Sequence, residues 1–287
     1  MVRLLLRLML VPALVVSALA RAQTWGWDDG TVPYVQTPSE IVERMLRMAE
    51  VHPGDRVIDL GSGDGRIVIA AAKRGASGLG VDLDPTLVKL ATQNAQAAGV
   101  ADRARFEVRD IFDTDLSRAT VVTMYLLPDF NAKLLPRLLA LKPGTRIVSH
   151  DGGIGDWPPD EALTMRTPEK PVGIGGNSKV ELWIVPGDVR GTWASEIPQH
   201  GGRWHFQVAQ HYQMLEVEVR AGGRDLLVRN TRLRGEEVKL VVTGIVNNRV
   251  WHHYFIGVAH GDAIEGEVTV SDGNNKVVYP WLAKRAR

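Results

Sequence analysis

From about residue 37 to 186, segments in which apolar residues recur at helical spacing alternate with short apolar runs typical of strands. Apolar residues at helical spacing after Pro38 and Ser39, within residues 38–51, predict an amphipathic helix. Short β-branched runs, typical of strands, follow at residues 56–60, 77–83, 105–110, 120–126 and 146–151. Helical patterns lie between them at residues 65–74, 85–98 and 129–141. Strand and helix repeated in this way predict a parallel sheet with helices on both faces.

The pattern changes after Asp151. The runs 163–167 and 179–185 are joined by a Pro/Gly-rich connection, so we expect an antiparallel pair that completes the sheet. From about Gly187 the apolar period is two: alternating runs at residues 204–209, 215–219, 237–244 and 263–270 are separated by turn signals. This spacing predicts an antiparallel meander, closed as a small barrel or a sandwich.

The first 22 residues have the layout of a secretory signal peptide. Arg3 and Arg7 precede the apolar stretch 8–16, and small residues follow at Ala18, Ala20 and Ala22. The apolar run is short for a membrane span, so we expect no stable span after cleavage and an exported protein of the periplasm or cell envelope. We therefore divide the chain into a signal peptide (1–22), an α/β domain (23–187) and an antiparallel β domain (188–287).

Charge and cysteine content exclude several kinds of function. Removing Arg3, Arg7 and Arg21 from the 34 basic residues leaves 31 against 33 acidic ones, a net charge of −2 for the mature chain. With no long basic run, a nucleic-acid partner is not expected. The chain has no cysteine, which excludes disulfides, thiolate metal sites and a cysteine nucleophile. We predict no metal site.

The clearest chemical signal is the stretch DLGSGDGR, residues 59–66, which follows a predicted strand and opens a helix. Its glycines allow a ligand to approach the backbone, but their spacing is G-x-G-x-G rather than the dinucleotide G-x-G-x-x-G. It also lacks the Lys-Ser/Thr pair of a phosphate loop. Asp59 and Asp64 would repel a pyrophosphate, whereas they favour a ligand with an ammonium and a sulfonium group. S-adenosylmethionine (SAM) is such a ligand.

Two further carboxylates follow neighbouring strands. Asp82 ends the second strand and can accept both ribose hydroxyls, because one carboxylate offers two acceptor oxygens. Asp110 ends the third strand and can accept the adenine amino group, with Ile111 and Phe112 as apolar walls. The alternative for any one strand-end acid is an N-cap of the next helix, and Asp84 before Pro85 fits that role better.

These motifs resemble those of class I SAM-dependent methyltransferases. The matching segments are VIDLGSGDGRIV, GVDLDP, VRDIF and LKPG, and they cover about residues 33–186. PYVQTPSEIVERML upstream is similar to the ATP-synthase c-subunit lysine methyltransferase family and its bacterial relatives. The resemblance implies a seven-stranded Rossmann-like sheet whose last strand is antiparallel. It also implies cofactor contacts at Asp59, Gly61, Gly63, Asp82 and Asp110, with Tyr34 and Thr37 covering the cofactor. The predicted cofactor-binding residues are these seven together with Ile111, the apolar wall.

Candidate acceptor-site residues lie at the ends of the fourth and fifth strands, where a substrate binds in open α/β sheets. They are Tyr125, Leu126, Leu127, Pro128, His150, Asp151 and Trp157. We assign catalysis to His150, Tyr125 and Asp151. His150 is expected to accept a proton from the acceptor, or else to cap the strand end through hydrogen bonds. Asp151 is expected to be the partner of His150 or only a turn residue. Tyr125 offers a ring to an ammonium group, as do Tyr34 and Trp157, although packing is the alternative for Trp157. YLLP lacks the Asn/Asp-Pro-Pro pattern of amino-methylating nucleic-acid enzymes.

The β domain carries weaker signals. GTW (191–193) and WLAKR (281–285) resemble small barrels in which a first-strand Trp packs under a last-strand Arg. His252 and His253 point to opposite faces of a strand, which argues against a shared metal ion. A scaffold, dimerisation (a homodimer through this domain) or acceptor recognition are its expected roles.

Two functions therefore compete. The first is a SAM-dependent methyltransferase that acts on a protein lysine or a small-molecule acceptor. The second is a non-catalytic protein of the cell envelope that binds SAM or S-adenosylhomocysteine (SAH), or serves as a scaffold, because the cofactor is made in the cytoplasm and the chain is predicted to be exported.

Overall fold

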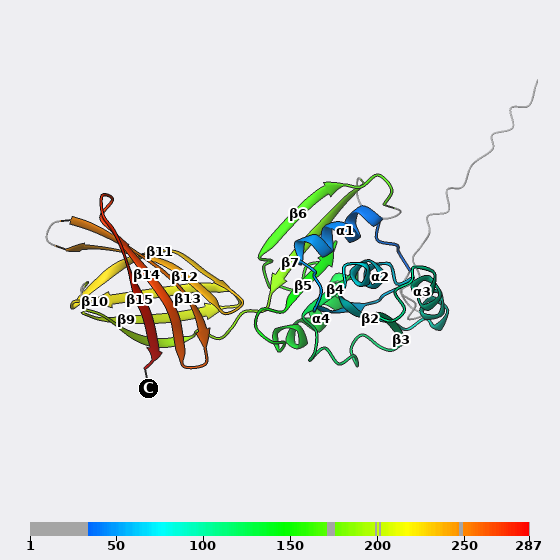
Figure 1. Ribbon diagram of the computed structural model, residues 1–287, viewed down its shortest axis with the longest axis horizontal. Coiled ribbons are helices and arrows are strands. Elements are labelled where there is room, and N and C mark those ends of the chain that lie inside the picture. The colour runs from blue at the N-terminus through cyan, green and yellow to red at the C-terminus, as the bar shows by residue number, and fades with distance from the viewer. Residues whose placement is uncertain (1–33, 171–175, 199, 201, 247–248, 287) are drawn as a thin grey trace, which may run out of the picture. The chain divides into compact units, whose positions relative to one another are not determined.

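The computed structural model describes residues 34–286 except 171–175, 199, 201 and 247–248 (Figure 1). The predicted signal peptide therefore lies outside the described residues. Among the residues that are described, no helix has the length and apolar content needed to cross a membrane.

The predicted parallel sheet and its helices are confirmed, with boundaries that follow the apolar runs. The helices are α1 (Ser39–Met48), α2 (Arg66–Lys73), α3 (Pro85–Ala97) and α4 (Pro128–Leu139). The strands are β1 (Arg56–Leu60), β2 (Ser77–Asp82), β3 (Ala104–Val108), β4 (Val121–Met124), β5 (Arg146–His150), β6 (Glu161–Arg166) and β7 (Asn177–Ile184).

These strands form one seven-stranded sheet in the order β3-β2-β1-β4-β5-β7-β6. Strands β1 to β5 pair in parallel, whereas β7 is antiparallel to both β5 and β6. The order reverses between β1 and β4, and in such sheets ligands bind beyond the carboxyl ends of the strands at this point.

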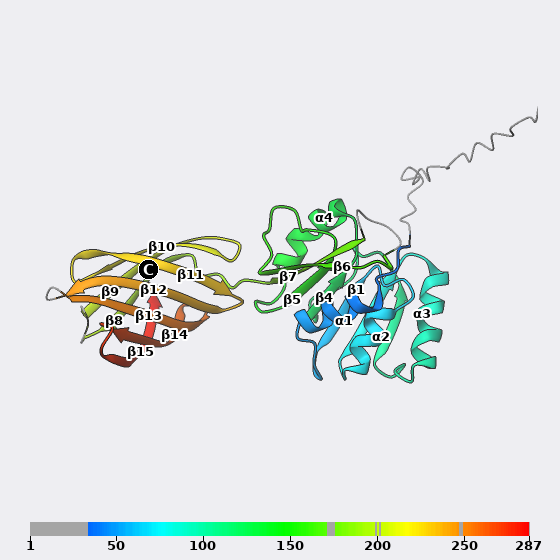
Figure 2. The same cartoon turned by 90° about the horizontal axis from the view of Figure 1, so that it is seen from above.

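Alternate residues of each strand enter different cores. Val57 and Val121 pack with α1 and α2, while the next residues, Ile58 and Val122, pack with Leu134 of α4. In Figure 2, α4 accordingly lies on the opposite side of the sheet from α1 and α2. The described connection from β3 to β4, residues 109–120, contains no helix, so a loop alone follows β3 on the α4 side.

The β domain is a closed barrel of eight antiparallel strands in which each strand pairs with its neighbours along the chain and β15 pairs with β8. The strands are β8 (Gly191–Ile197), β9 (Gly202–His211), β10 (Met214–Ala221), β11 (Arg224–Arg234), β12 (Glu237–Val246), β13 (Arg249–His260), β14 (Ala263–Ser271) and β15 (Lys276–Arg285). The prediction of a meander closed as a barrel or sandwich is thus confirmed in its barrel form.

Inward-facing residues fill the barrel, as in other small barrels. Trp193, Trp204, Phe255 and Trp281 are all buried. The guanidinium carbon of Arg285 on the last strand lies 4.3 Å from the ring centre of Trp193 on the first, in the arrangement that GTW and WLAKR suggested.

Candidate functional site

Within the stretch 59–66, residues 61–65 form a tight turn between β1, which ends at Leu60, and α2, which begins at Arg66. Gly61 and Gly63 have φ of 78° and 52°, in the left-handed region that glycine adopts without a Cβ clash. The amides of Gly61 and Ser62 both donate to the carbonyl of Val81, at 3.0 and 2.9 Å. The Gly63 amide donates to Oδ2 of Asp82 at 2.8 Å. These hydrogen bonds therefore join the turn to β2 at the carboxyl ends of the strands.

Gly65 closes the turn and also has a left-handed φ, 82°. A Cβ at this position would lie 2.6 Å from the Phe106 ring on β3 and 2.8 Å from the Ala91 Cβ on α3. Close packing of the helix start against its neighbours thus requires glycine here.

Asp59 is the most unusual group of the turn because its carboxyl group is buried, with 2% of the residue exposed. Thr123 on β4 donates its hydroxyl to Asp59 at 2.6 Å. Burial raises the pKa of Asp59 to about 7; the hydrogen bond from Thr123 opposes this shift, and the charges of Asp82 and Asp64 add to it. The sequence did not identify Thr123, since its contact depends on the pairing of β1 with β4.

Asp82 is the last residue of β2, as expected, whereas β3 ends at Val108, two residues before Asp110. Besides Gly63, the Asp82 carboxylate accepts the Asp84 amide at 3.0 Å. Asp110 lies just after β3 and accepts the Phe112 amide at 2.8 Å, and Ile111 packs partly buried beside the core under α4. Asp84 caps α3 by accepting the Thr86 amide at 2.7 Å, which confirms its N-cap assignment.

Asp64 differs from the sequence interpretation. It forms an ion pair with Arg66 at 2.6 Å, so its charge is offset and does not repel an anion in the way we expected. Arg66 also donates to the carbonyl of Thr37 at 2.7 Å and thereby ties the turn to the segment before α1. Sequence reasoning missed Arg66, although its place two residues after Asp64 was a usable signal.

A second cluster surrounds His150 at the end of β5. The His150 ring is fully buried, with Nδ1 3.4 Å from the Thr37 hydroxyl and Nε2 3.0 Å from the Ser178 hydroxyl. Burial lowers the pKa of His150 to about 4; Asp151 opposes and Lys170 adds to this shift. Because the ring is neutral near pH 7 with both nitrogens engaged, the geometry favours hydrogen-bonding support of the strand end over proton transfer.

Tyr125 and Asp151 complete this cluster. The Tyr125 ring lies against His150 with 4.0 Å between ring centres. Burial raises the pKa of Tyr125 to about 12, and the charge of Asp151 and a hydrogen bond to it add to the shift. Asp151 has a left-handed φ of 58°, accepts the Lys179 amide at 2.8 Å and pairs with the nearly buried Lys170 amine. The three predicted catalytic residues thus lie together with Thr37.

The other candidates lie in different surroundings. Leu126 lies close to the turn, since a Cβ on Gly61 would be 3.0 Å from its side chain. Trp157 is buried and its carbonyl accepts the Trp183 indole N–H at 2.9 Å, which is a packing role. Tyr34 is 43% exposed, and its cofactor contact stays a prediction.

Known methyltransferases are similar to the part of the chain that carries this geometry. Residues 59–161 match the model of the ANTKMT methyltransferase domain. A protein-lysine N-methyltransferase of Saccharolobus islandicus is 46% identical over 137 residues, which cover 47% of this chain and 85% of that protein. The ATP synthase c-subunit lysine N-methyltransferase of Mus musculus is 35% identical over 130 residues, which cover 45% of this chain and 52% of that protein.

This chain therefore spans only about half the length of the mouse relative. Among solved structures, an RNA methyltransferase from Salinibacter ruber in complex with S-adenosyl-L-homocysteine is 48% identical, with a TM-score of 0.48. The match covers 54% of this chain and 96% of that one. Since the match to the Saccharolobus islandicus protein spans most of that relative, this chain belongs to the family of SAM-dependent protein-lysine N-methyltransferases.

Proposed function

We propose that this protein binds SAM at the turn of residues 59–65 and transfers its methyl group to a lysine side chain of another protein. The observation that carries the proposal is the buried Asp59 carboxyl group beside a glycine turn, with Asp82 at the end of the next strand. Family membership supports lysine as the acceptor.

The residues present fit this cofactor. A cation beside the buried Asp59 would stabilise its ionised carboxylate and oppose the rise in its pKa, and the ammonium group of SAM is such a cation. The Asp82 oxygens hold two backbone amides and retain lone pairs for ribose hydroxyls. Asp110 with Ile111 would face the adenine. When bound, SAM supplies the activated methyl group, and the protein supplies orientation.

The acceptor side would be shaped by Tyr125 and its neighbours. Tyr125 is fixed by His150 on its face and by Asp151 at its hydroxyl, so its ring is pre-oriented to contact a lysine chain. With a pKa of about 12 it stays protonated near neutral pH. Since Asp151 is paired with Lys170 and His150 is neutral and engaged, we infer that the acceptor amine loses its proton to solvent before transfer.

Labelled methyl transfer tests this function. Purified protein is incubated with SAM that carries a deuterated methyl group and with a protein fraction from cells of its own source; lysine labelling is then mapped by mass spectrometry. We expect labelled lysines with the wild type and none with Asp82→Ala. Label found only in small molecules would refute the lysine acceptor.

The competing function is a non-catalytic SAM- or SAH-binding or scaffold protein of the envelope, and the predicted signal peptide favours it. Binding of SAH without any methyl transfer would support this alternative. We also propose that the chain is exported through residues 1–22. A reporter fused after Gln23 that remains in the cytoplasm would exclude export.

A further inference from the structure

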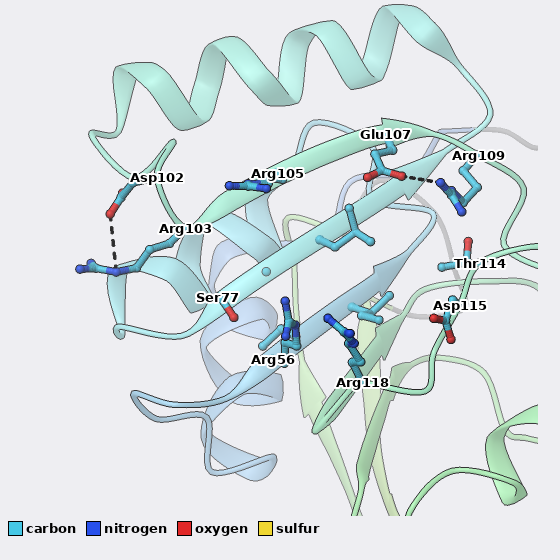
Figure 3. A pocket seen from close by; sticks show the side chains of 14 residues that line it. Arg56, Ser77, Asp102, Arg103, Arg105, Glu107, Arg109, Thr114, Asp115 and Arg118 are labelled. Carbon is cyan, nitrogen blue, oxygen red and sulfur yellow. Dashed lines mark ion pairs between the residues drawn. The ribbon is translucent and has the colours of Figure 1, made fainter.

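The side of the sheet opposite α2 and α3 carries a cavity of about 440 Å³ over β1, β2 and β3 (Figure 3). It lies where a loop rather than a helix joins β3 to β4. The cavity has the size of small-molecule sites, which range over roughly 300–1,000 Å³. Because its lining residues come mainly from β1–β3 and the 109–120 connection, it is separate from the Tyr125 and His150 cluster.

Strand alternation determines which side chains this surface presents. On β1 the same side holds Arg56 and Ile58, on β2 it holds Leu79, and on β3 it holds Arg105. Register places Arg56 beside Ser77, Ile58 beside Leu79, and Leu79 beside Arg105. The floor is thus apolar at its centre, with arginines on both sides.

Positive charge exceeds negative charge around the cavity. The lining includes five arginines and three carboxylates: Arg56, Arg103, Arg105, Arg109, Arg118, Asp102, Glu107 and Asp115. Arg103 and Arg109 pair with Asp102 and Glu107 at 3.8 and 2.8 Å. In the described part of the chain, the side chains of Arg56, Arg105 and Arg118 make no hydrogen bond or ion pair within the usual distances, although Arg118 is near enough to the exposed Asp115 for their charges to interact.

The backbone that carries these arginines is held in place. The Arg56 amide donates to the Thr120 hydroxyl at 2.9 Å, and the Thr120 amide donates to the Arg56 carbonyl at 3.0 Å, which ties the segment of Arg118 to β1. Arg137 of α4 donates to the carbonyls of Ile111, at 3.2 Å, Phe112 and Thr114. The cavity wall is therefore pre-organised, which lowers the entropic cost of binding.

We propose that this cavity binds a compact anion that carries at least two phosphate or carboxylate groups. Three unpaired guanidinium groups arrive from β1, β3 and the loop, and each can hold an acidic group through two parallel hydrogen bonds. The apolar centre formed by Ile58 and Leu79 suits the organic body of such a molecule. The proposal does not depend on methyl transfer.

Calorimetry with two probes, sodium tripolyphosphate and citrate, tests the site and separates phosphate from carboxylate ligands. We expect saturable binding of at least one probe by the wild type. Arg105→Gln and Arg118→Gln should each weaken it by about tenfold or more, and Arg105→Lys should not restore it, because lysine lacks the planar fork. Arg220→Gln, an exposed arginine of the barrel, removes the same charge elsewhere and should leave affinity unchanged.

Thermal unfolding of the same variants guards against a folding artefact. Since these arginines are exposed and unpaired, their loss should leave Tm unchanged or raise it by relieving repulsion. Failure of both probes to bind the wild type would overturn the proposal, as would an equal loss in Arg220→Gln. Tighter binding of duplex DNA through the same arginines would also overturn it, in favour of a nucleic-acid surface.

Discussion

Thr123 donates its hydroxyl to the buried carboxyl group of Asp59 across the pairing of β1 with β4, with 2.6 Å between the two oxygens. This hydrogen bond does not offset the loss of water around Asp59, whose pKa burial raises to about 7 with the charges of Asp82 and Asp64 contributing. The site therefore changes charge near neutral pH, and three predictions depend on this part of the molecule.

Ligand affinity should depend on pH through Asp59. The ammonium group of SAH favours the ionised carboxylate, so binding should release a proton near pH 7 and strengthen from pH 6 to pH 8. Below pH 7 the affinity should fall by about tenfold per pH unit. Calorimetry in two buffers of different ionisation enthalpy measures the proton release. An affinity that stays constant from pH 6 to pH 8, or an equally steep dependence in Asp59→Asn, would refute the role of Asp59.

Stability of the unliganded protein should show the opposite trend. Because the folded pKa of Asp59 lies above the value of about 3.8 for a solvated Asp, the folded state holds an extra proton between these values. Its stabilising contribution is present at low pH and is lost as pH rises through 7. Asp59→Asn should therefore raise the free energy of unfolding at pH 8 by roughly 1–4 kcal/mol and leave it unchanged at pH 4. Urea unfolding at both pH values measures it, and a destabilised variant at pH 8 would contradict the prediction.

The contribution of Asp55 to stability should depend on pH in the opposite direction to that of Asp59. Burial alone would raise its pKa, but hydrogen bonds from Thr120 and the His52 amide and the ion pair with Arg146 outweigh it and lower the pKa. Its stabilisation is present above about pH 3.8 and is lost as pH falls below that value. Asp55→Asn should cost about 2–4 kcal/mol at pH 7.

Urea unfolding at pH 7 against Asp102→Asn provides the control for Asp55. Asp102 pairs with Arg103 at 3.8 Å in an exposed position, so its substitution should change stability by no more than about 0.5 kcal/mol. Equal effects of the two substitutions would mean that the buried pair adds no stability.

The barrel should depend on the stacking of Arg285 over Trp193. Arg285 also donates to Asp262 at 3.1 Å and to the carbonyl of Asp188 at 3.1 Å. Arg285→Lys keeps the charge but loses the planar group, and should cost about 1–2 kcal/mol in urea unfolding followed by tryptophan fluorescence. Lys284→Ala, on the exposed side of the same strand, is the matched control. A lysine variant as stable as the wild type would show that the stacking adds nothing.

Local patterns predicted the strands and helices well where each has a regular period. The run RVIDL is β1 itself, and Asp84 before Pro85 caps α3 as expected. Strand β11 had no such signal, since Leu227 and Val228 are adjacent and the register shifts between Arg229 and Arg232. Because its sequence is largely polar, β11 could not be predicted from a local pattern, and its place is determined by the closure of the barrel.

For the site, the sequence predicted only which residues come together through the order of strands along the chain. Asp59 lies near the end of β1, Asp82 ends β2 and Asp110 follows β3, so topology alone brings them to the carboxyl ends of neighbouring strands. The partners of these groups come from distant segments: Thr123 reaches Asp59 across a strand pair, and Thr37 and Ser178 reach His150 from two sides. Such contacts depend on tertiary packing, which no local pattern encodes.

The most direct test of SAM binding at this turn is calorimetry of the purified protein with SAH, comparing wild type, Asp82→Ala and Asp84→Ala. Asp82→Ala removes the predicted ribose acceptor and the Gly63 contact, and should weaken binding by on the order of 100-fold. Asp84→Ala removes only the α3 cap and should keep wild-type affinity, with a loss of about 1 kcal/mol in stability. We predict saturable binding that depends on Asp82 and not on Asp84; absence of binding by the wild type, or unchanged binding by Asp82→Ala, would contradict SAM binding at this turn.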